Sequence, residues 1–157
     1  MIEQIYTYFT VEILFLWLNL GVLPFWLVLI IFPQSQVCRF FITSIFPIFI
    51  LSVAYGYLIN LFFNEGYDFI RNFELYLGLD AVSNLFTDKA FTVLFWIHFL
   101  GINLFCGGWI VKDSQKFGIN KILMSFPLLI TYFIGPIGLT LYWIIRIFYS
   151  KRINLYD

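Results

Sequence analysis

The sequence predicts an all-α integral membrane protein: a four-helix bundle with an interfacial segment between its second and third spans. Of the 157 residues, 62% are hydrophobic and only 11% are charged. A soluble domain needs more charge than this on its surface, and a domain this small cannot bury so many apolar side chains. The apolar residues also fall into four runs of roughly the 20 residues that a helix needs to cross a bilayer. We therefore predict a single membrane domain rather than an unusually apolar soluble one.

The four predicted spans cover residues 11–32, 40–63, 91–111 and 124–148. Pro33 and Gln34 end the first run, and short polar loops follow the first and third runs. Residues 1–10 contain Glu3 but no Lys or Arg. Because a signal peptide starts with a basic stretch, we expect the first run to be a retained span.

The segment at 64–89 separates the second and third runs and mixes acidic with apolar residues. It contains Glu65, Asp68 and Asp80 beside Phe73 and Leu77. This mixture is typical of a helix that lies at the membrane interface with its apolar side toward lipid or the bundle. A plain solvated loop has a similar composition. Both alternatives stay open.

The orientation in the membrane is not predicted by the charges. We call the side that holds the N-terminus side A. Four spans put segment 64–89 and the C-terminus on side A as well, and the two short loops on side B. Side B then carries Arg39, Lys112, Lys116 and Lys121, and side A carries Arg71, Lys89, Lys151 and Arg152, with Arg146 at the span edge. The positive-inside rule compares these counts, which are nearly equal.

Several classes of function are disfavoured by composition. The formal net charge is zero and Lys and Arg are not clustered, which argues against nucleic acid as a partner. Cys38 and Cys106 have no metal-site or disulfide-framework spacing, and one chain with a single histidine, His98, cannot hold a bis-histidine haem. There is no phosphate-binding glycine loop and no serine-nucleophile motif. We predict no metal and no cofactor.

The third run contains two polar residues that need partners in lipid. His98 and Asn103 point to different helix faces at the period of 3.6 residues. The face of His98 also holds Ile102, Phe105 and Trp109, and the face of Asn103 holds Trp96, Leu100 and Gly107. We therefore expect the third helix to be surrounded by other helices.

In the fourth run, small residues form a stripe that lets another backbone approach closely. The stripe consists of Thr131, Gly135, Gly138 and Tyr142. Pro136 has no backbone N–H, and in a continuous helix it leaves the carbonyl of Tyr132 without a donor. Counting from the span ends places Asn103 at the level of Gly135, so its amide is expected to serve that carbonyl.

The same depth counting suggests a polar pocket. His98 lies about 10 Å from the side A end of its span, at about 1.5 Å per residue, and Tyr142 lies at a similar depth. Arg146, Glu12 and Asn60 are expected in the same half of the membrane. We predict that these five line one pocket on side A. Such a pocket is either a proton-transfer site or an interhelical hydrogen-bond network in which Glu12 and Arg146 form an ion pair.

Nearly the whole chain resembles a known family. The run Trp96-Ile97-His98-Phe99-Leu100-Gly101-Ile102-Asn103-Leu104-Phe105-Cys106-Gly107-Gly108-Trp109, followed by Asp113-Ser114, is similar to a signature of the abscisic-acid-deficiency-four-like family. So is Gly135-Pro136-Ile137-Gly138-Leu139, followed by Tyr142 and Arg146. The resemblance implies a four-span, multi-pass protein of the bacterial or cyanobacterial type, in a bacterial inner membrane or a thylakoid.

The resemblance also implies a role in carotenoid (xanthophyll) modification. Plant members of the family are chloroplast proteins needed to make neoxanthin from violaxanthin. The implied reaction is an epoxide-to-allene isomerisation, which needs an acid and a base. The implied catalytic residues are His98 and Tyr142, oriented by Arg146 or Glu12. The implied substrate-binding residues are Trp96, Asn103, Trp109, Gly135 and Gly138.

One departure from the family pattern bears on the proposed chemistry, and a second interpretation stays open. The family commonly has Asp where Asn103 stands, and an Asn cannot act as a carboxylate acid or base. The alternative is a non-catalytic membrane subunit that binds pigment or stabilises a larger complex. A small transporter ranks below both, because few charged residues line any path through the spans. The partners predicted are membrane lipid, a carotenoid, and a second copy of the chain or a larger membrane complex.

Overall fold

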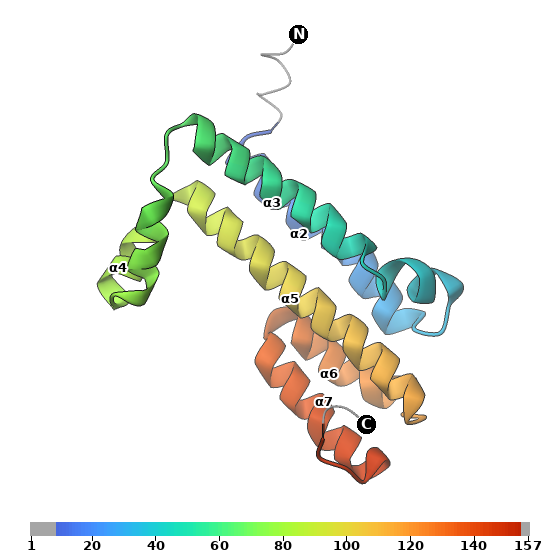
Figure 1. The fold of residues 1–157 in the computed structure, drawn as a ribbon. Coiled ribbons are helices and arrows are strands. Elements are labelled where there is room, and N and C mark those ends of the chain that lie inside the picture. The colour runs from blue at the N-terminus through green and yellow to red at the C-terminus, as the bar shows by residue number, and fades with distance from the viewer. Residues whose placement is uncertain (1–8, 155–157) are drawn as a thin grey trace. The chain divides into compact units, whose positions relative to one another are not determined.

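The computed structural model describes residues 9–154, apart from the side chains of Arg71, Glu74 and Leu75, and this part of the chain is helical without a strand. The prediction that the first apolar run is retained, rather than removed as a signal peptide, used residues 1–10. Of these, residues 1–8 lie outside the described part of the chain. The elements, shown in Figure 1, are α2 (Val11–Ile31), the π-helix η1 (Cys38–Ile42), α3 (Phe46–Asn64), the 3-10 helix η2 (Phe69–Tyr76), α4 (Leu79–Leu85), α5 (Lys89–Lys116), α6 (Lys121–Phe133) and α7 (Gly135–Ser150).

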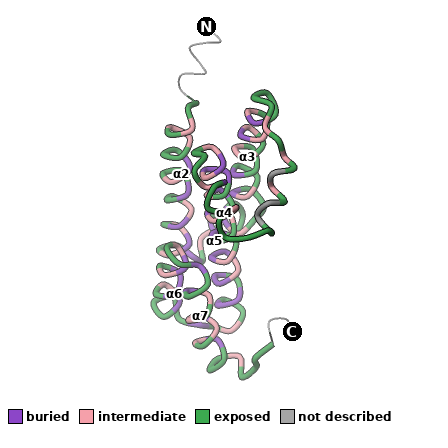
Figure 2. The backbone as a smooth tube through the Cα atoms, turned by 90° about the vertical axis from the view of Figure 1, so that its left-hand side faces the viewer, coloured by how far each residue is buried: buried purple, intermediate pink, exposed green. Residues whose placement is uncertain are grey.

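The all-α membrane class is confirmed. Three helices, α2, α3 and α5, are long and apolar enough to cross a membrane. In Figure 2, buried positions recur along α2 between exposed ones, as expected of a helix with one packed face and one face toward lipid. A fourth span, and with it the four-helix bundle, stays a prediction.

The first three helices differ from the predicted spans mainly at their ends. α2 ends one residue before the predicted boundary. α3 begins at Phe46 rather than at residue 40, because the preceding residues form η1 and Ser44 Oγ accepts a hydrogen bond from the N–H of Phe46 at 3.1 Å. α5 extends beyond 91–111 at both ends. It ends before Gly118, whose φ of +64° suits a residue without a side chain.

The segment between α3 and α5 is mostly helical rather than a plain loop. It consists of η2 and α4. Its apolar side chains Ile70, Phe73, Tyr76, Leu77 and Leu79 are each more than 70% exposed. This combination favours the interfacial-helix alternative, because such side chains find an apolar environment only at lipid or at a partner surface.

The fourth apolar run is not one helix. The chain breaks at Ile134, whose backbone angles are φ −140° and ψ 81°. Pro136 stands in the first turn of α7, where its missing N–H leaves no bond unmade. α6 has 13 residues and α7 has 16, so they measure about 20 and 24 Å and neither spans a core of about 30 Å. The prediction of a continuous helix over 124–148 is therefore wrong.

α7 folds back on α6 to form a helical hairpin. The two helices run side by side in Figure 1. A Cβ atom placed on Gly138 would overlap the backbone and hydroxyl of Thr131 in α6. Near the end of α7, Arg146 pairs with Asp113 close to the end of α5. The C-terminal end of α7 has therefore returned to the level at which α6 began.

The chain divides into two compact units, and the division falls inside α2, α3 and α5. The first unit comprises Met1–Leu20 and Phe49–Phe99, and the second comprises Gly21–Ile48 and Leu100–Asp157. In the first unit, Trp96 Nε1 donates to Asn19 Oδ1 at 3.1 Å. The second unit has a core of large buried side chains, among them Leu29, Ile110, Met124 and Leu128. The second unit contains the hairpin.

The hairpin changes the expected orientation. If α2, α3 and α5 are the spans and the hairpin does not cross, the C-terminal end of α7 lies on side B. Seven of the nine Lys and Arg residues then lie on side B and only Arg71 and Lys89 on side A. The positive-inside rule now predicts that side B faces the cytoplasm in a bacterial inner membrane.

This orientation is testable with topology reporters in a bacterial host. A reporter fused after residue 157 is expected to be active on the cytoplasmic side, and one inserted in segment 64–89 on the opposite side. Four full spans would instead place the two reporters on the same side. That outcome would contradict the hairpin as a membrane structure.

Candidate functional site

A buried polar cluster joins the end of α5 to α7. Asp113 Oδ2 accepts a hydrogen bond from the Tyr142 hydroxyl at 2.7 Å and another from Arg146 Nε at 2.7 Å. Tyr142 and Arg146 are four residues apart and so share one face of α7. The Arg146 guanidinium also donates to the carbonyl of Asn154 at 2.8 Å and lies over the Phe117 ring, 4.8 Å from its centroid.

The cluster is almost closed to solvent. The Arg146 side chain is 1% exposed and that of Asp113 is 9% exposed. Charges buried to this extent are tolerated when they are paired and hydrogen-bonded, and removal of one partner leaves an uncompensated charge. The cluster therefore ties α7 to α5 through electrostatics as well as through packing.

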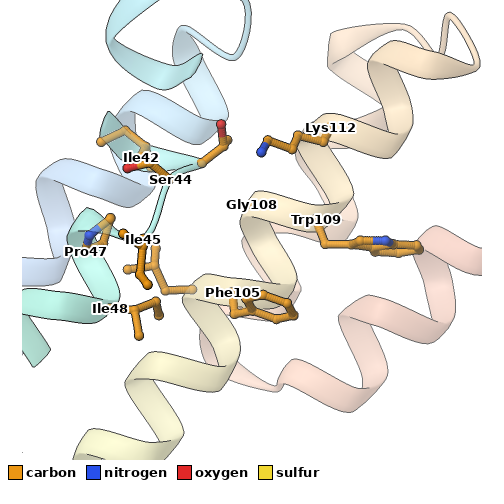
Figure 3. A pocket seen from close by; sticks show the side chains of 11 residues that line it. Ile42, Ser44, Ile45, Pro47, Ile48, Phe105, Gly108, Trp109 and Lys112 are labelled. Atoms are coloured by element: carbon orange, nitrogen blue, oxygen red, sulfur yellow. The ribbon is translucent and has the colours of Figure 1, made fainter. Parts of the chain in front are cut away.

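Trp109 connects this cluster to an apolar pocket. Trp109 lies one turn before Asp113 in α5, and its ring packs edge-on against that of Tyr142, with centroids 5.6 Å apart. Trp109 also lines a pocket of about 560 Å³ between α5 and the segment at 42–48. Figure 3 shows Lys112 pointing from α5 toward that segment, where Ser44 stands, while Ile45, Ile48 and Phe105 lie further along. The pocket thus has an apolar body and a polar end.

At the bend of the hairpin, Asn103 packs against Gly135. Asn103 is 4% exposed, and a Cβ atom on Gly135 would overlap its Oδ1. The predicted common level of these two residues is confirmed. Within residues 9–154, however, Asn103 Nδ2 has no hydrogen-bond partner. The expected bond to the carbonyl of Tyr132 is absent, because Pro136 begins a new helix instead of interrupting one.

The predicted five-residue pocket draws on both units, with Glu12, Asn60 and His98 in the first and Tyr142 and Arg146 in the second, and it stays a prediction. Glu12 is exposed and pairs with Lys89 at 2.9 Å, whereas Arg146 pairs with Asp113. Of the two alternatives left open for this pocket, the one that pairs Glu12 with Arg146 is therefore wrong in that ion pair. The depth match of His98 with Tyr142 assumed one continuous helix over 124–148, whereas the chain breaks at Ile134.

His98 and Asn60 have local partners in the first unit. His98 is exposed. Its ring packs edge-on against Tyr55, with centroids 5.0 Å apart, and its Nδ1 lies 3.2 Å from the carbonyl of Leu94. Asn60 accepts a hydrogen bond from Asn64 at 3.1 Å. The catalytic roles assigned to His98, Tyr142, Arg146 and Glu12 stay predictions.

Of the residues predicted to bind substrate, Trp109 lines the apolar pocket. Trp96 donates a hydrogen bond to Asn19, and its ring stacks on that of Phe99 with centroids 4.8 Å apart. Gly135 and Gly138 are closed off by Asn103 and Thr131, so their faces serve packing inside the protein. No group of three His, Cys, Asp or Glu side chains suited to a metal ion occurs among the described residues.

Two features were missed by the sequence reasoning. Asp113 follows the exposed Lys112 and was placed in a polar loop, although it lies one turn after Trp109 on the same helical face. The segment at 42–48 falls inside the predicted span 40–63, whereas the regular helix α3 begins only at Phe46. The role of Asp113 had a signal in the sequence, because Tyr142 and Arg146 stand four residues apart and suit a shared acidic partner. The irregular segment at 42–48 had no such signal.

Comparison with known proteins extends the resemblance. The family model for ABA DEFICIENT 4-like proteins matches residues 13–142, which include Trp109, Asp113 and Tyr142. The protein "ABA DEFICIENT 4, chloroplastic" of Arabidopsis thaliana is 22% identical over 129 residues, which are 80% of this chain and 57% of the plant protein. The chain thus spans a little over half the length of that relative. No solved structure matches it. Since the family model covers most of the sequence, the protein belongs to the ABA DEFICIENT 4-like family.

Proposed function

We propose that the protein binds a carotenoid in the membrane and acts in xanthophyll modification of the epoxide-to-allene type. The proposal depends on one observation, the apolar pocket with a tryptophan wall and a polar end in a member of this family. It places the protein in a bacterial inner membrane or a thylakoid. Family membership supports the carotenoid class, and the pocket supports a site for it.

The chemical character of the pocket suits an oxygenated carotenoid ring. Ile45, Ile48 and Phe105 offer apolar contact to the ring and the start of the polyene. Lys112 and Ser44 stand at the polar end, where an ammonium and a hydroxyl can donate to a ring oxygen. Ligand sites are typically apolar with a few polar groups of this kind. The remaining polyene extends into lipid.

The isomerisation needs no co-reactant. The carbon next to the ring loses a proton, the freed electron pair forms the second double bond of the allene, and the epoxide C–O bond breaks. The oxygen takes up a proton and becomes a hydroxyl. Lys112, at the polar end of the pocket, would supply this proton. The ring of Trp109 packs against Tyr142, which is hydrogen-bonded to Asp113. In this proposal Lys112 is the acid, and His98, which does not line the pocket, takes no part.

A second candidate is a non-catalytic pigment-binding subunit, in a homo-oligomer or a larger membrane complex. The observation that favours it is the lining of the pocket, which contains no carboxylate and no histidine. A general base for the carbon-bound proton would then have to come from elsewhere.

Expression in a host that accumulates violaxanthin, followed by chromatography of the pigments, tests both candidates. Catalysis predicts a new allenic xanthophyll. Lys112→Gln is expected to lower its yield about a hundredfold, the usual effect of losing a general acid. Lys121→Gln serves as the matched control, because Lys121 is exposed and does not line the pocket.

The outcomes separate the candidates. Unchanged pigments with a xanthophyll that co-purifies, and that is lost in Trp109→Ala, would support the pigment-binding subunit. If the purified protein carries no xanthophyll and the pigments stay unchanged, both candidates fail.

A further inference from the structure

A second, polar pocket lies beside the apolar one in the second unit. It measures about 430 Å³ and is lined by Pro33, Arg39, Thr43, Val111, Lys112 and Gln115. Its two cations come from different elements, Arg39 from η1 and Lys112 from α5. Gln115 Nε2 donates to the carbonyl of Pro33 at 2.8 Å. This bond holds the segment after α2 against the end of α5.

The two cations of this pocket have no anion of their own. No carboxylate lines the pocket. No ion pair with Arg39 or Lys112 occurs within the described part of the chain. The neighbouring Asp113 is already bound by Arg146 and Tyr142. Two cations that line one small pocket without a counter-charge attract an anion, and a phosphate can accept hydrogen bonds from both.

The polar pocket continues the apolar one. Thr43 and Lys112 line both. A ligand that fills the two pockets therefore has an anionic end between Arg39 and Lys112 and an apolar chain along Ile45, Ile48 and Phe105. These are the properties of a phospholipid with an anionic headgroup.

We propose that the polar pocket binds the phosphate of an anionic phospholipid, whose acyl chain enters the adjoining apolar pocket. The predicted orientation agrees with this ligand, because it would place side B at the cytoplasmic leaflet, where anionic lipids attract clustered Lys and Arg. The site does not depend on the carotenoid proposal. Because Lys112 is shared, lipid and pigment compete for it.

Native mass spectrometry of the purified protein tests the site. The protein in detergent is mixed with equal amounts of phosphatidylglycerol and phosphatidylcholine of the same chain length. Preferential retention of phosphatidylglycerol is expected. Each cation near an anionic headgroup is worth about fivefold in affinity, so Arg39→Gln/Lys112→Gln is expected to weaken retention by about 25-fold. This readout involves no pigment, so it can fail or succeed independently of the carotenoid proposal.

A matched control removes the same charge elsewhere. Lys121→Gln/Lys151→Gln lowers the net charge equally, and neither residue lines the pocket. This variant is expected to keep the preference of the unmodified protein. Circular dichroism verifies that each variant is folded. If the Arg39/Lys112 variant does not fold, the preference of the unmodified protein still decides the proposal.

Three results would overturn the proposal. Equal retention of the two lipids by the unmodified protein would show that the headgroup charge is not recognised. An equal loss of phosphatidylglycerol retention in the control variant would show that retention depends on the net charge of the protein rather than on Arg39 and Lys112. Displacement of phosphatidylglycerol by millimolar inorganic phosphate would show a site for free phosphate rather than for lipid.

Discussion

Replacement of Asp113 by alanine is expected to destabilise the second unit by about 3–5 kcal/mol, the usual cost of breaking a buried ion pair. The variant leaves the Arg146 guanidinium buried without a counter-charge and deprives the Tyr142 hydroxyl of its acceptor. Unfolding of the purified protein by denaturant in detergent, followed by tryptophan fluorescence, measures the change. Trp109 reports locally, because its ring packs against Tyr142.

The chain offers a matched control in its other ion pair. Lys89 and Glu12 are 2.9 Å apart, but their side chains are 79% and 64% exposed. Exposed pairs contribute little, so Glu12→Ala is expected to leave the free energy of unfolding nearly unchanged. If Asp113→Ala costs no more than Glu12→Ala, the cluster does not hold α7 to α5.

A double variant tests whether the charges of Asp113 and Arg146 act as a pair. Arg146→Met alone leaves the Asp113 carboxylate without its cation. Asp113→Ala/Arg146→Met removes both charges, and the loss is expected to be clearly smaller than the sum of the two single losses. A loss equal to the sum would mean that the two residues act independently.

The spans were predictable because lipid sets both their length and their composition. Val11–Ile31 matches its predicted range within one residue for this reason. The prediction of one helix over 124–148 failed because composition cannot distinguish one long helix from two short helices that fold back on each other. The sequence does carry a signal for the break, in Gly135 and Pro136 together, since Pro favours the first turn of a helix over its interior.

The cluster of Asp113, Tyr142 and Arg146 was not predicted because the depth counting assumed that fourth helix. Depth counting put Tyr142 and Arg146 at the level of His98, and the fold-back moves both to the level of Asp113. Asp113 and Lys112 are neighbours in sequence, yet one is buried and the other exposed, which follows from the 100° between successive residues of α5. The pocket depends on the irregular backbone at 42–48, and no periodicity predicts such a segment.

Gly138→Ala is expected to disrupt the hairpin. The new methyl group would overlap the backbone nitrogen, the Cα and the hydroxyl of Thr131. Backbone atoms cannot move aside as a side chain can, so α6 and α7 must separate. Inserting even one methyl group into a packed interior costs about 1–3 kcal/mol and sometimes more, and this site lies at the upper end of that range. The same denaturant titration measures it.

Two controls identify the cause of that loss. Gly56→Ala introduces the same methyl group in α3, where nothing lies within 4 Å, and is expected to stabilise the protein by about 0.5–1 kcal/mol because alanine favours a helix over glycine. Thr131→Ala, combined with Gly138→Ala, removes only the hydroxyl from the overlap and is expected to rescue little.

Separation of the helices would also draw Arg146 away from Asp113, so Asp113→Ala should add less to Gly138→Ala than it costs alone. Full additivity would mean that the close approach at Gly138 does not position the cluster, and that the hairpin and the buried ion pair form independently.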